Sequence, residues 1–196
     1  MNLPERIALI DMDGTVVDYD GQMKRDLEAL RSPNEPPYDA LGPQDHAPHI
    51  EARMSVIKRQ PGWWRNLPEY PVGMGVVAML RELGFSLNIL TKGPYRTTAA
   101  WMEKVDWVRS HIPDAAVTIT EDKGLVYGKV LVDDWPPYIQ RWLAWRPRGL
   151  VIMPDHPWNA DFTHPNVIQY DGCKDHREQV YERLREIAAN TRGDEP

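Results

Sequence analysis

The chain has 196 residues, with 29 acidic and 23 basic side chains, so its formal charge is −6 with neutral histidines. Hydrophobic residues make up 42% of the sequence, which excludes a disordered chain and predicts one domain with a sizeable core. The negative charge argues against a general binder of nucleic acids or of anionic membranes. The single cysteine, Cys173, excludes an intrachain disulfide framework and suits a reducing compartment.

The sequence shows no targeting segment. Its N-terminus lacks a basic stretch followed by a long apolar core, so no signal peptide is predicted. The apolar runs are far shorter than the roughly 20 residues that span a bilayer. We therefore expect a cytoplasmic protein without membrane segments.

Short apolar runs alternate with helical patterns along the chain. Buried strands are predicted at Ile7–Ile10, Ser86–Leu90, Gly128–Val132, Leu150–Met153 and Val167–Tyr170, with Val117–Thr120 as a further extended piece. Apolar spacings of three and four predict helices at 76–83, 101–112 and 180–187. The alternation indicates an α/β fold, in which a parallel sheet of about five strands is flanked by helices and sites lie at the strands' carboxyl ends.

Residues 19–75 interrupt this alternation. They are rich in proline and contain two helical stretches, Gln22–Leu30 and His49–Gln60. We interpret them as a small helical cap inserted after the first strand, above its carboxyl end. The core would then comprise residues 1–18 and 76–190, and residues 191–196 would form a frayed polar tail.

The strongest signal for chemistry follows the first strand, where the sequence is Asp11-Met-Asp13-Gly14-Thr15. Asp and Gly are common turn residues, which gives the plain structural interpretation of this segment. However, two such close carboxylates raise each other's pKa unless a cation lies between them. One carboxylate can also act as a nucleophile, while a second protonates a leaving alkoxide and then deprotonates water.

This segment resembles motif I of the haloacid dehalogenase (HAD) superfamily of aspartate-nucleophile phosphatases. The resemblance implies a Rossmann-like HAD core, with Asp11 attacking phosphorus and Asp13 acting as general acid and base. Superfamily members that transfer phosphoryl groups in ion pumps typically carry Thr at the position of Asp13, so the aspartate favours a phosphatase.

The predicted strand that ends at Leu90 is followed by Thr91-Lys92-Gly93-Pro94. A hydroxyl at the carboxyl end of a strand resembles motif II, and the resemblance implies that Thr91 binds the phosphoryl oxygen. Lys92 either adds positive potential at the phosphate site or points to water, and the sequence leaves both interpretations open.

The superfamily also needs a lysine that pairs with the nucleophile and balances the phosphate charge. Lys123 and Lys129 both qualify by residue type. Lys123 is preferred because it stands ten residues before Asp133, whereas Lys129 lies inside the predicted strand.

The strand after Lys123 ends in Asp133-Asp134, which resembles motif IV and implies a Mg²⁺ site. The expected ligands are the carboxylate of Asp11, the main-chain carbonyl of Asp13 and the carboxylate of Asp134. Asp133 would act through water or orient its neighbours. Hard oxygen ligands of this kind suit Mg²⁺.

The predicted cap carries the clue to the substrate. Its segment 54–68 includes a Pro-Gly pair followed by Trp63 and Trp64, which resembles a signature of the 5'(3')-deoxyribonucleotidase family. Tyr19 lies six residues beyond Asp13, and the resemblance implies that this aromatic ring stacks on the nucleobase. Trp63 and Trp64 are further candidates for base contact, or else they pack the cap onto the core.

Other conspicuous residues carry weaker signals. Four histidines lie among prolines without ligand spacing, so no histidine metal site is predicted: His46, His49, His156 and His164. Four tryptophans that follow motif IV are interpreted as core and interface: Trp135, Trp142, Trp145 and Trp158.

The sequence therefore predicts a Mg²⁺-dependent phosphatase that hydrolyses (deoxy)ribonucleoside monophosphates through an aspartyl-phosphate. The partner would be a small nucleotide, with no membrane or polynucleotide, and a homodimer is left open. One alternative is an HAD phosphatase for another small phosphate or a nucleic-acid 3'-phosphate end. Another is a non-catalytic phosphate- or partner-binding module on the same fold.

Overall fold

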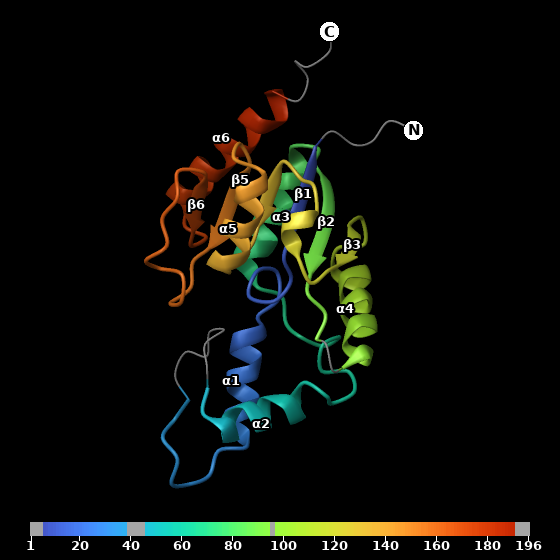
Figure 1. Ribbon diagram of the computed structural model, residues 1–196, viewed down its shortest axis with the longest axis vertical. Helices are drawn as coiled ribbons and strands as arrows, with labels where there is room; N and C mark the ends of the chain where they lie inside the picture. The colour runs from blue at the N-terminus through green and yellow to red at the C-terminus, as the bar shows by residue number, and fades with distance from the viewer. Residues whose placement is uncertain (1–5, 39–45, 95–96, 191–196) are drawn as a thin grey trace.

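The computed structural model describes residues 6–38, 46–94 and 97–190, so the predicted tail 191–196 lies outside the described residues. Six parallel strands form one sheet in the order β3-β2-β1-β4-β5-β6 (Figure 1). The strands are β1 (Ile7–Ile10), β2 (Ser86–Thr91), β3 (Ala116–Ile119), β4 (Val130–Val132), β5 (Leu150–Pro154) and β6 (Val167–Tyr170). The parallel sheet is confirmed, and the additional extended piece is its edge strand β3.

The strand order reverses direction at β1, which lies in the middle of the sheet. Leu9 of β1 is in register with Asn88 of β2 on one side and with Leu131 of β4 on the other. Parallel α/β sheets bind their ligands beyond the carboxyl ends of the strands at such a switch point. The topology therefore places the candidate site just after Ile10.

Helices cover both faces of the sheet, and the central strands β4 and β5 are buried throughout. One face packs against α3 (Pro71–Glu82), α4 (Thr98–His111) and α6 (Lys174–Asn190), and the other against α5 (Pro136–Trp145). Along β1, Ala8 and Ile10 point to the first core and Leu9 to the second, as the two-residue period of a strand requires.

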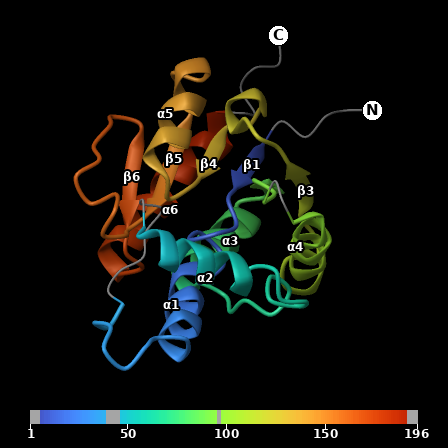
Figure 2. The ribbon, with the colours of Figure 1, turned by 60° about the horizontal axis from the view of Figure 1, so that its bottom comes forward.

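The cap contains α1 (Tyr19–Ala29) and α2 (Pro48–Ile57), which lie together beyond the carboxyl ends of the strands (Figures 1 and 2). Asp18 starts α1, since its carboxylate accepts a hydrogen bond from the Gly21 amide at 3.0 Å. The cap has a hydrophobic cluster of its own, formed by Met23, Leu27, Tyr38, Ile50, Met54 and Ile57. The division of the chain into cap and core remains a prediction.

Helix α3 begins at Pro71, earlier than the apolar spacing from Val76 predicts. Proline is favoured in the first turn because it has no N–H to leave unpaired. A Cβ on Gly73 would lie 1.7 Å from the carbonyl oxygen of Thr15, so the backbone of α3 touches the loop after β1. The first turn of α3 thus packs directly against the loop that follows β1.

None of the helices within the described residues combines the length and the apolar character that crossing a membrane requires.

Candidate active site

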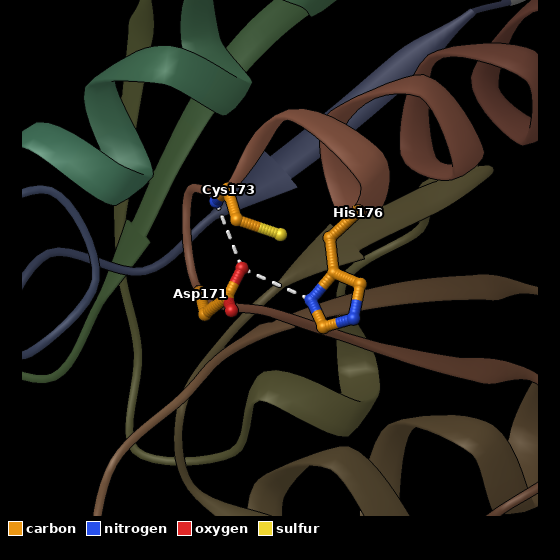
Figure 3. Close-up of side chains that lie close together, drawn as sticks. All are labelled: Asp171, Cys173 and His176. Carbon is orange, nitrogen blue, oxygen red and sulfur yellow. Dashed lines mark hydrogen bonds and ion pairs between the residues drawn. The ribbon is translucent and has the colours of Figure 1, made fainter.

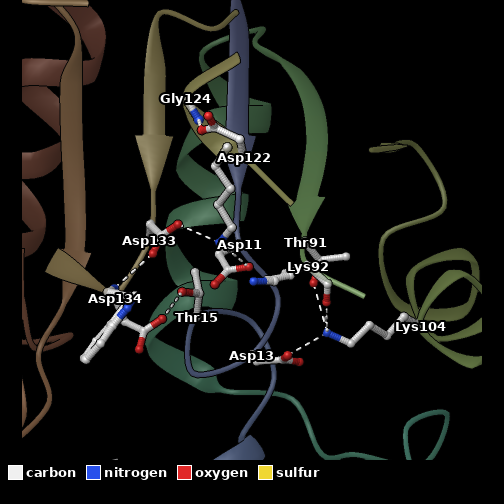
Figure 4. A network of polar contacts seen from close by, with 12 residues as sticks. Asp11, Asp13, Thr15, Thr91, Lys92, Lys104, Asp122, Gly124, Asp133 and Asp134 are labelled. Carbon is white, nitrogen blue, oxygen red and sulfur yellow. Dashed lines mark hydrogen bonds and ion pairs between the residues drawn. The ribbon is translucent and has the colours of Figure 1, made fainter. Parts of the chain in front are cut away.

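The carboxyl ends of the central strands open into one cavity of about 340 Å³, which we call the active-site cavity. Asp11 follows β1, Thr91 ends β2, and Asp133 and Asp134 follow β4 (Figure 4). Core and cap both contribute to the lining, which consists of Asp11, Asp13, Tyr19, Lys58, Trp64, Lys92, Gly93, Pro94, Lys123, Asp134, Trp135 and Tyr138.

Lys123 is the buried cation beside the predicted nucleophile. Its Nζ lies 2.7 Å from Asp11 Oδ1 and 2.7 Å from Asp133 Oδ2. Burial by itself lowers the pKa of Lys123, but the two carboxylates outweigh it and hold that pKa above its ordinary value. Lys123 is therefore a permanent positive charge next to Asp11.

The local fold explains why Lys123, rather than Lys129, reaches Asp11. Lys123 opens the short 3-10 helix η1 (Lys123–Leu125), which Asp122 caps by accepting a hydrogen bond from the Gly124 amide at 2.8 Å. Lys129 lies at the amino ends of the strands, directly before β4, where its amide donates to the carbonyl of Ile7 at the start of β1.

Asp134 lines the active-site cavity, and both of its carboxylate oxygens accept hydrogen bonds. The Thr15 hydroxyl donates to Oδ1 at 3.1 Å, and the Trp158 indole N–H donates to Oδ2 at 3.1 Å. Gly14 adopts φ +73°, and a Cβ there would lie 2.8 Å from Oδ2, so glycine is required on both counts. Burial, followed by the neighbouring carboxylates, raises the pKa of Asp134 well above its ordinary range.

Asp133 lies deeper in the site. Its Oδ2 accepts from Lys123, and its Oδ1 accepts from the backbone amide of Trp135 at 2.9 Å. Burial raises the pKa of Asp133, although Lys123 partly opposes the effect. Both oxygens are thus engaged by protein groups, and Asp133 does not line the cavity.

Asp13 pairs with a lysine that the sequence analysis did not single out. Lys104 is fully buried in α4, and its Nζ donates to Asp13 Oδ2 at 2.6 Å, Thr91 Oγ1 at 3.0 Å and the Lys92 carbonyl at 3.1 Å (Figure 4). The other oxygen of Asp13 has no hydrogen-bond partner within the described chain. Burial raises the pKa of Asp13 although Lys104 lowers it.

A signal for Lys104 is nevertheless present in the sequence. It stands three residues after Trp101 and four before Val108, on the apolar face of the predicted helix. A lysine on a buried helix face requires a partner for its charge, which the carboxylate of Asp13 provides.

Lys92 lies at the rim of the active-site cavity. Its side chain is 46% exposed, and its Nζ forms an ion pair with Glu121 at 3.0 Å. The hydrogen bond to Glu121 raises the pKa of Lys92. Lys92 therefore adds positive charge at the entrance while its ammonium remains in contact with water.

The three aromatic candidates form one cluster but differ in their relation to the cavity. The rings of Tyr19 and Trp64 lie 5.7 Å apart with an interplanar angle of 28°, and both line the cavity. Trp63 meets Trp64 edge-on at 4.9 Å, and its indole N–H donates to Asp26 at 2.7 Å. Trp63 lies outside the cavity lining and packs against both the cap cluster and the core.

The cap also places a lysine in the cavity lining, Lys58. Its carbonyl accepts a hydrogen bond from the Trp64 indole at 3.0 Å. Burial lowers the pKa of Lys58, while Asp13 opposes that shift. Along residues 6–38, 46–94 and 97–190, its ammonium forms no hydrogen bond or ion pair, although Asp13 and Glu51 act on it electrostatically.

The donor set of the site fits a divalent cation. Oxygens of Asp11, Asp133 and Asp134 lie within 4.8 Å of one another. Two buried lysines, Lys104 and Lys123, form ion pairs with Asp13, Asp11 and Asp133. Among the described residues no ion pair reaches the fourth carboxylate, Asp134, so a cation there would balance its charge.

A second group of polar side chains lies after β6, outside the cavity lining (Figure 3). The Asp171 carboxylate accepts from the Cys173 amide at 2.8 Å and pairs with His176 Nδ1 at 3.0 Å. The Cys173 carbonyl accepts from the Arg177 amide at 2.9 Å, which starts α6. These contacts order a helix start, and the exposed thiol of Cys173 does not reach the active-site cavity.

Comparison with solved structures identifies the fold. An HAD family hydrolase from Deinococcus radiodurans R1, with bound phosphate and sodium, matches 97% of this chain and 97% of its own. The TM-score is 0.54 at 12% sequence identity, so the likeness establishes the fold. The predicted Rossmann-like HAD fold is confirmed.

The family follows from the sequence comparisons. Residues 5–180 match the family model described as "5' nucleotidase, deoxy (Pyrimidine), cytosolic type C protein". Relatives from Bordetella bronchiseptica and Bordetella pertussis, each named "Putative 5'(3')-deoxyribonucleotidase", are 30% identical over 167 residues, 80% of this chain and 87% of each relative. The chain belongs to this family of HAD-like 5'-nucleotidases and is a phosphomonoester hydrolase.

Proposed function

We propose that this enzyme hydrolyses (deoxy)ribonucleoside monophosphates to nucleoside and phosphate with the aid of Mg²⁺. The observation that carries the proposal is a cavity in which Asp11, paired with Lys123, faces the aromatic rings of Tyr19 and Trp64. A nucleoside monophosphate has a dianionic end, which suits the charged part of this cavity, and a flat base, which suits its aromatic part. The names of the Bordetella relatives favour deoxyribonucleotides as substrates.

Asp11 acts as the nucleophile in this proposal. Its carboxylate oxygen attacks phosphorus, forms an aspartyl-phosphate and breaks the bond between phosphorus and the ester oxygen. Asp13 transfers its proton to that leaving oxygen and then takes a proton from water. The resulting hydroxide attacks the aspartyl-phosphate, which releases phosphate and restores Asp11. Burial raises the pKa of Asp13, which favours the protonated form needed at the first step.

The proposed phosphate site depends on how Thr91 is held. Lys104 donates a hydrogen bond to Thr91 Oγ1 at 3.0 Å, so the hydroxyl proton of Thr91 stays available for a phosphoryl oxygen. Lys123 supplies positive charge beside Asp11. Lys92 raises the potential at the entrance, where a dianion arrives.

Mg²⁺ would be held by the carboxylates of Asp11 and Asp134 and by the main-chain carbonyl of Asp13. When bound, the ion neutralises charge on the transferring phosphoryl group. Asp134 is favoured over Asp133 as the direct ligand because it lines the cavity, whereas Asp133 lies outside the lining and is already paired with the ammonium of Lys123. Asp133 then serves to hold Lys123 in place.

The cap would provide the wall for the nucleobase. Stacking on an aromatic side chain contributes about 1–3 kcal/mol per base. Tyr19 and Trp64 are placed for that contact, whereas Trp63 supports them from within the cap. The ammonium of Lys58, which lines the cavity, would donate to an acceptor group on the substrate. A single cysteine suits the reducing conditions of the cytoplasm, where we propose that the enzyme works.

The test is phosphate release from a panel of deoxyribonucleotides, ribonucleotides and sugar phosphates, each with Mg²⁺ and with EDTA. We expect release from nucleoside monophosphates that Mg²⁺ supports and EDTA abolishes. The variant Asp11→Asn should lose activity while its circular dichroism spectrum stays that of the wild type. Full activity of Asp11→Asn would refute the mechanism, and a preference for sugar phosphates would refute the substrate class.

A further inference from the structure

The loop between β5 and β6 folds back onto the proposed metal site. The buried side chain of Asn159 anchors it, because its amide donates to the Asp134 carbonyl at 2.8 Å and to the Pro154 carbonyl at 2.9 Å. The Asn159 side-chain oxygen accepts from the His156 amide at 2.9 Å. Residues 156–159 are thereby fixed to the backbone of Asp134.

Two side chains of this loop reach the acidic residues themselves. His156 Nε2 lies 2.7 Å from the carbonyl oxygen of Gly14, and the Trp158 indole N–H donates to Asp134 Oδ2 at 3.1 Å. A carbonyl oxygen can only accept, so Nε2 carries the proton that His156 donates. Burial lowers the pKa of His156, which favours the neutral imidazole with a single N–H.

The same side chains form a stack of three rings. His156 lies 4.1 Å from Trp158 with an interplanar angle of 7°, and 5.2 Å from Tyr70 with an angle of 24°. The Tyr70 amide donates to the carbonyl of Val16 at 2.8 Å, so the far end of the stack is tied to the loop after β1. The rings thus bridge the loops that follow β1 and β5.

We propose that His156 and Trp158 are positioning residues for the metal site: Trp158 orients the Asp134 carboxylate, and His156 holds the turn that presents the Asp13 carbonyl. The inference rests on the proposed function, because it takes these oxygens to be Mg²⁺ ligands. Partners that hydrogen-bond to metal ligands fix their orientation, and their loss typically lowers metal affinity about 10- to 100-fold.

The arrangement of donors around Asp134 argues for this role rather than for packing alone. Each oxygen receives one hydrogen bond, from Thr15 or from Trp158, and each keeps a lone pair for a cation. The Trp158 indole N–H is thus a directed contact to one of these oxygens. A purely hydrophobic ring at position 158 would fill the space but would lack that donor.

The experiment measures the Mg²⁺ dissociation constant by calorimetry without substrate, and the Mg²⁺ dependence of phosphate release. Trp158→Phe keeps a stacking ring and removes the N–H, and we expect about 10-fold or weaker Mg²⁺ binding. At saturating Mg²⁺, KM for the nucleotide should stay near that of the wild type. Trp145→Phe is the matched control, because Trp145 is 66% exposed and is not part of the cavity lining.

A second pair of variants keeps the inference testable if Trp158→Phe fails to fold. His156→Leu removes the donor to Gly14 and should weaken Mg²⁺ binding, whereas His156→Gln retains an amide donor and should recover part of it. Wild-type Mg²⁺ affinity in Trp158→Phe or in His156→Leu would overturn the inference and leave the proposed function standing. If the wild type itself binds no Mg²⁺, the proposed function fails.

Discussion

Replacement of Lys104 by methionine tests the buried ion pair that fixes Asp13. Methionine keeps an unbranched side chain of similar length and removes the charge. The substitution takes the donor away from three acceptors: Asp13 at 2.6 Å, Thr91 at 3.0 Å and the Lys92 carbonyl at 3.1 Å. Asp13 is then left as a buried carboxylate without its cation.

The structure sets the size of the expected effect. Breaking a buried ion pair by removing one partner costs about 3–5 kcal/mol. Asp13 retains 32% exposure of its side chain toward the cavity, so we take the lower end, about 3 kcal/mol. For a domain of this size, that corresponds to a fall in Tm of about 6–12 °C. Misplacement of Asp13 and Thr91 should also lower kcat about 100-fold.

The assays are thermal unfolding by circular dichroism and steady-state phosphate release. Lys92→Met is the matched control, because Lys92 is 46% exposed and pairs only at the surface with Glu121. Lys92→Met should change the Tm only slightly relative to the wild type. A Lys104→Met protein with wild-type Tm and wild-type kcat would refute the assignment of Lys104 as the anchor of Asp13.

Two further changes test the contacts around the site. Gly73→Ala should destabilise the protein by about 1–3 kcal/mol, because the added Cβ would lie 1.7 Å from the Thr15 carbonyl oxygen. Gly75→Ala is the control, because its added Cβ would meet nothing closer than 3.6 Å. Equal Tm values for the two variants would contradict the contact between Gly73 and Thr15. The hydrogen bond from Arg53 lowers the pKa of Glu35 from 4.5 to about 2. The stabilisation that this pair gives the folded protein is therefore fully present above pH 4.5 and is lost as the pH falls toward 2. Glu35→Gln should therefore lower Tm at pH 7 more than at pH 3, and an equal loss at both would refute the pairing.

Much of the candidate site could be predicted from the sequence because its parts follow buried strands. In a parallel sheet the carboxyl ends of neighbouring strands share one edge, so Asp11, Thr91 and Asp134 had to converge once their strands were identified. Lys123 was preferred by its distance from Asp133, and the structure brings it to 2.7 Å from Asp11. The β1 loop has little freedom, since Gly14 must adopt a positive φ.

The sequence predicts an inserted cap, but it does not predict which of the cap's side chains reach the cavity. The family resemblance implied base contact for Tyr19, whereas the sequence offered no means to rank Trp63 against Trp64. Their separation depends on how α1 packs against the chain after α2, which leaves Trp63 bound to Asp26 and turns Trp64 toward the cavity. The close contact of Gly73 in α3 with the Thr15 carbonyl was likewise beyond the reach of the sequence.

The sequence by itself determined the parallel sheet, the order of the acidic residues and Thr91 along it, and the family resemblance that indicates the class of chemistry, because each follows from local periodicity or from motifs of a few residues. Only the tertiary structure decided which distant side chains support them. Lys104 reaches Asp13 across 91 residues of sequence, and Trp158 reaches Asp134 across 24. Such pairs are set by the packing of helix α4 and of the β5–β6 loop against the sheet, which no local pattern encodes.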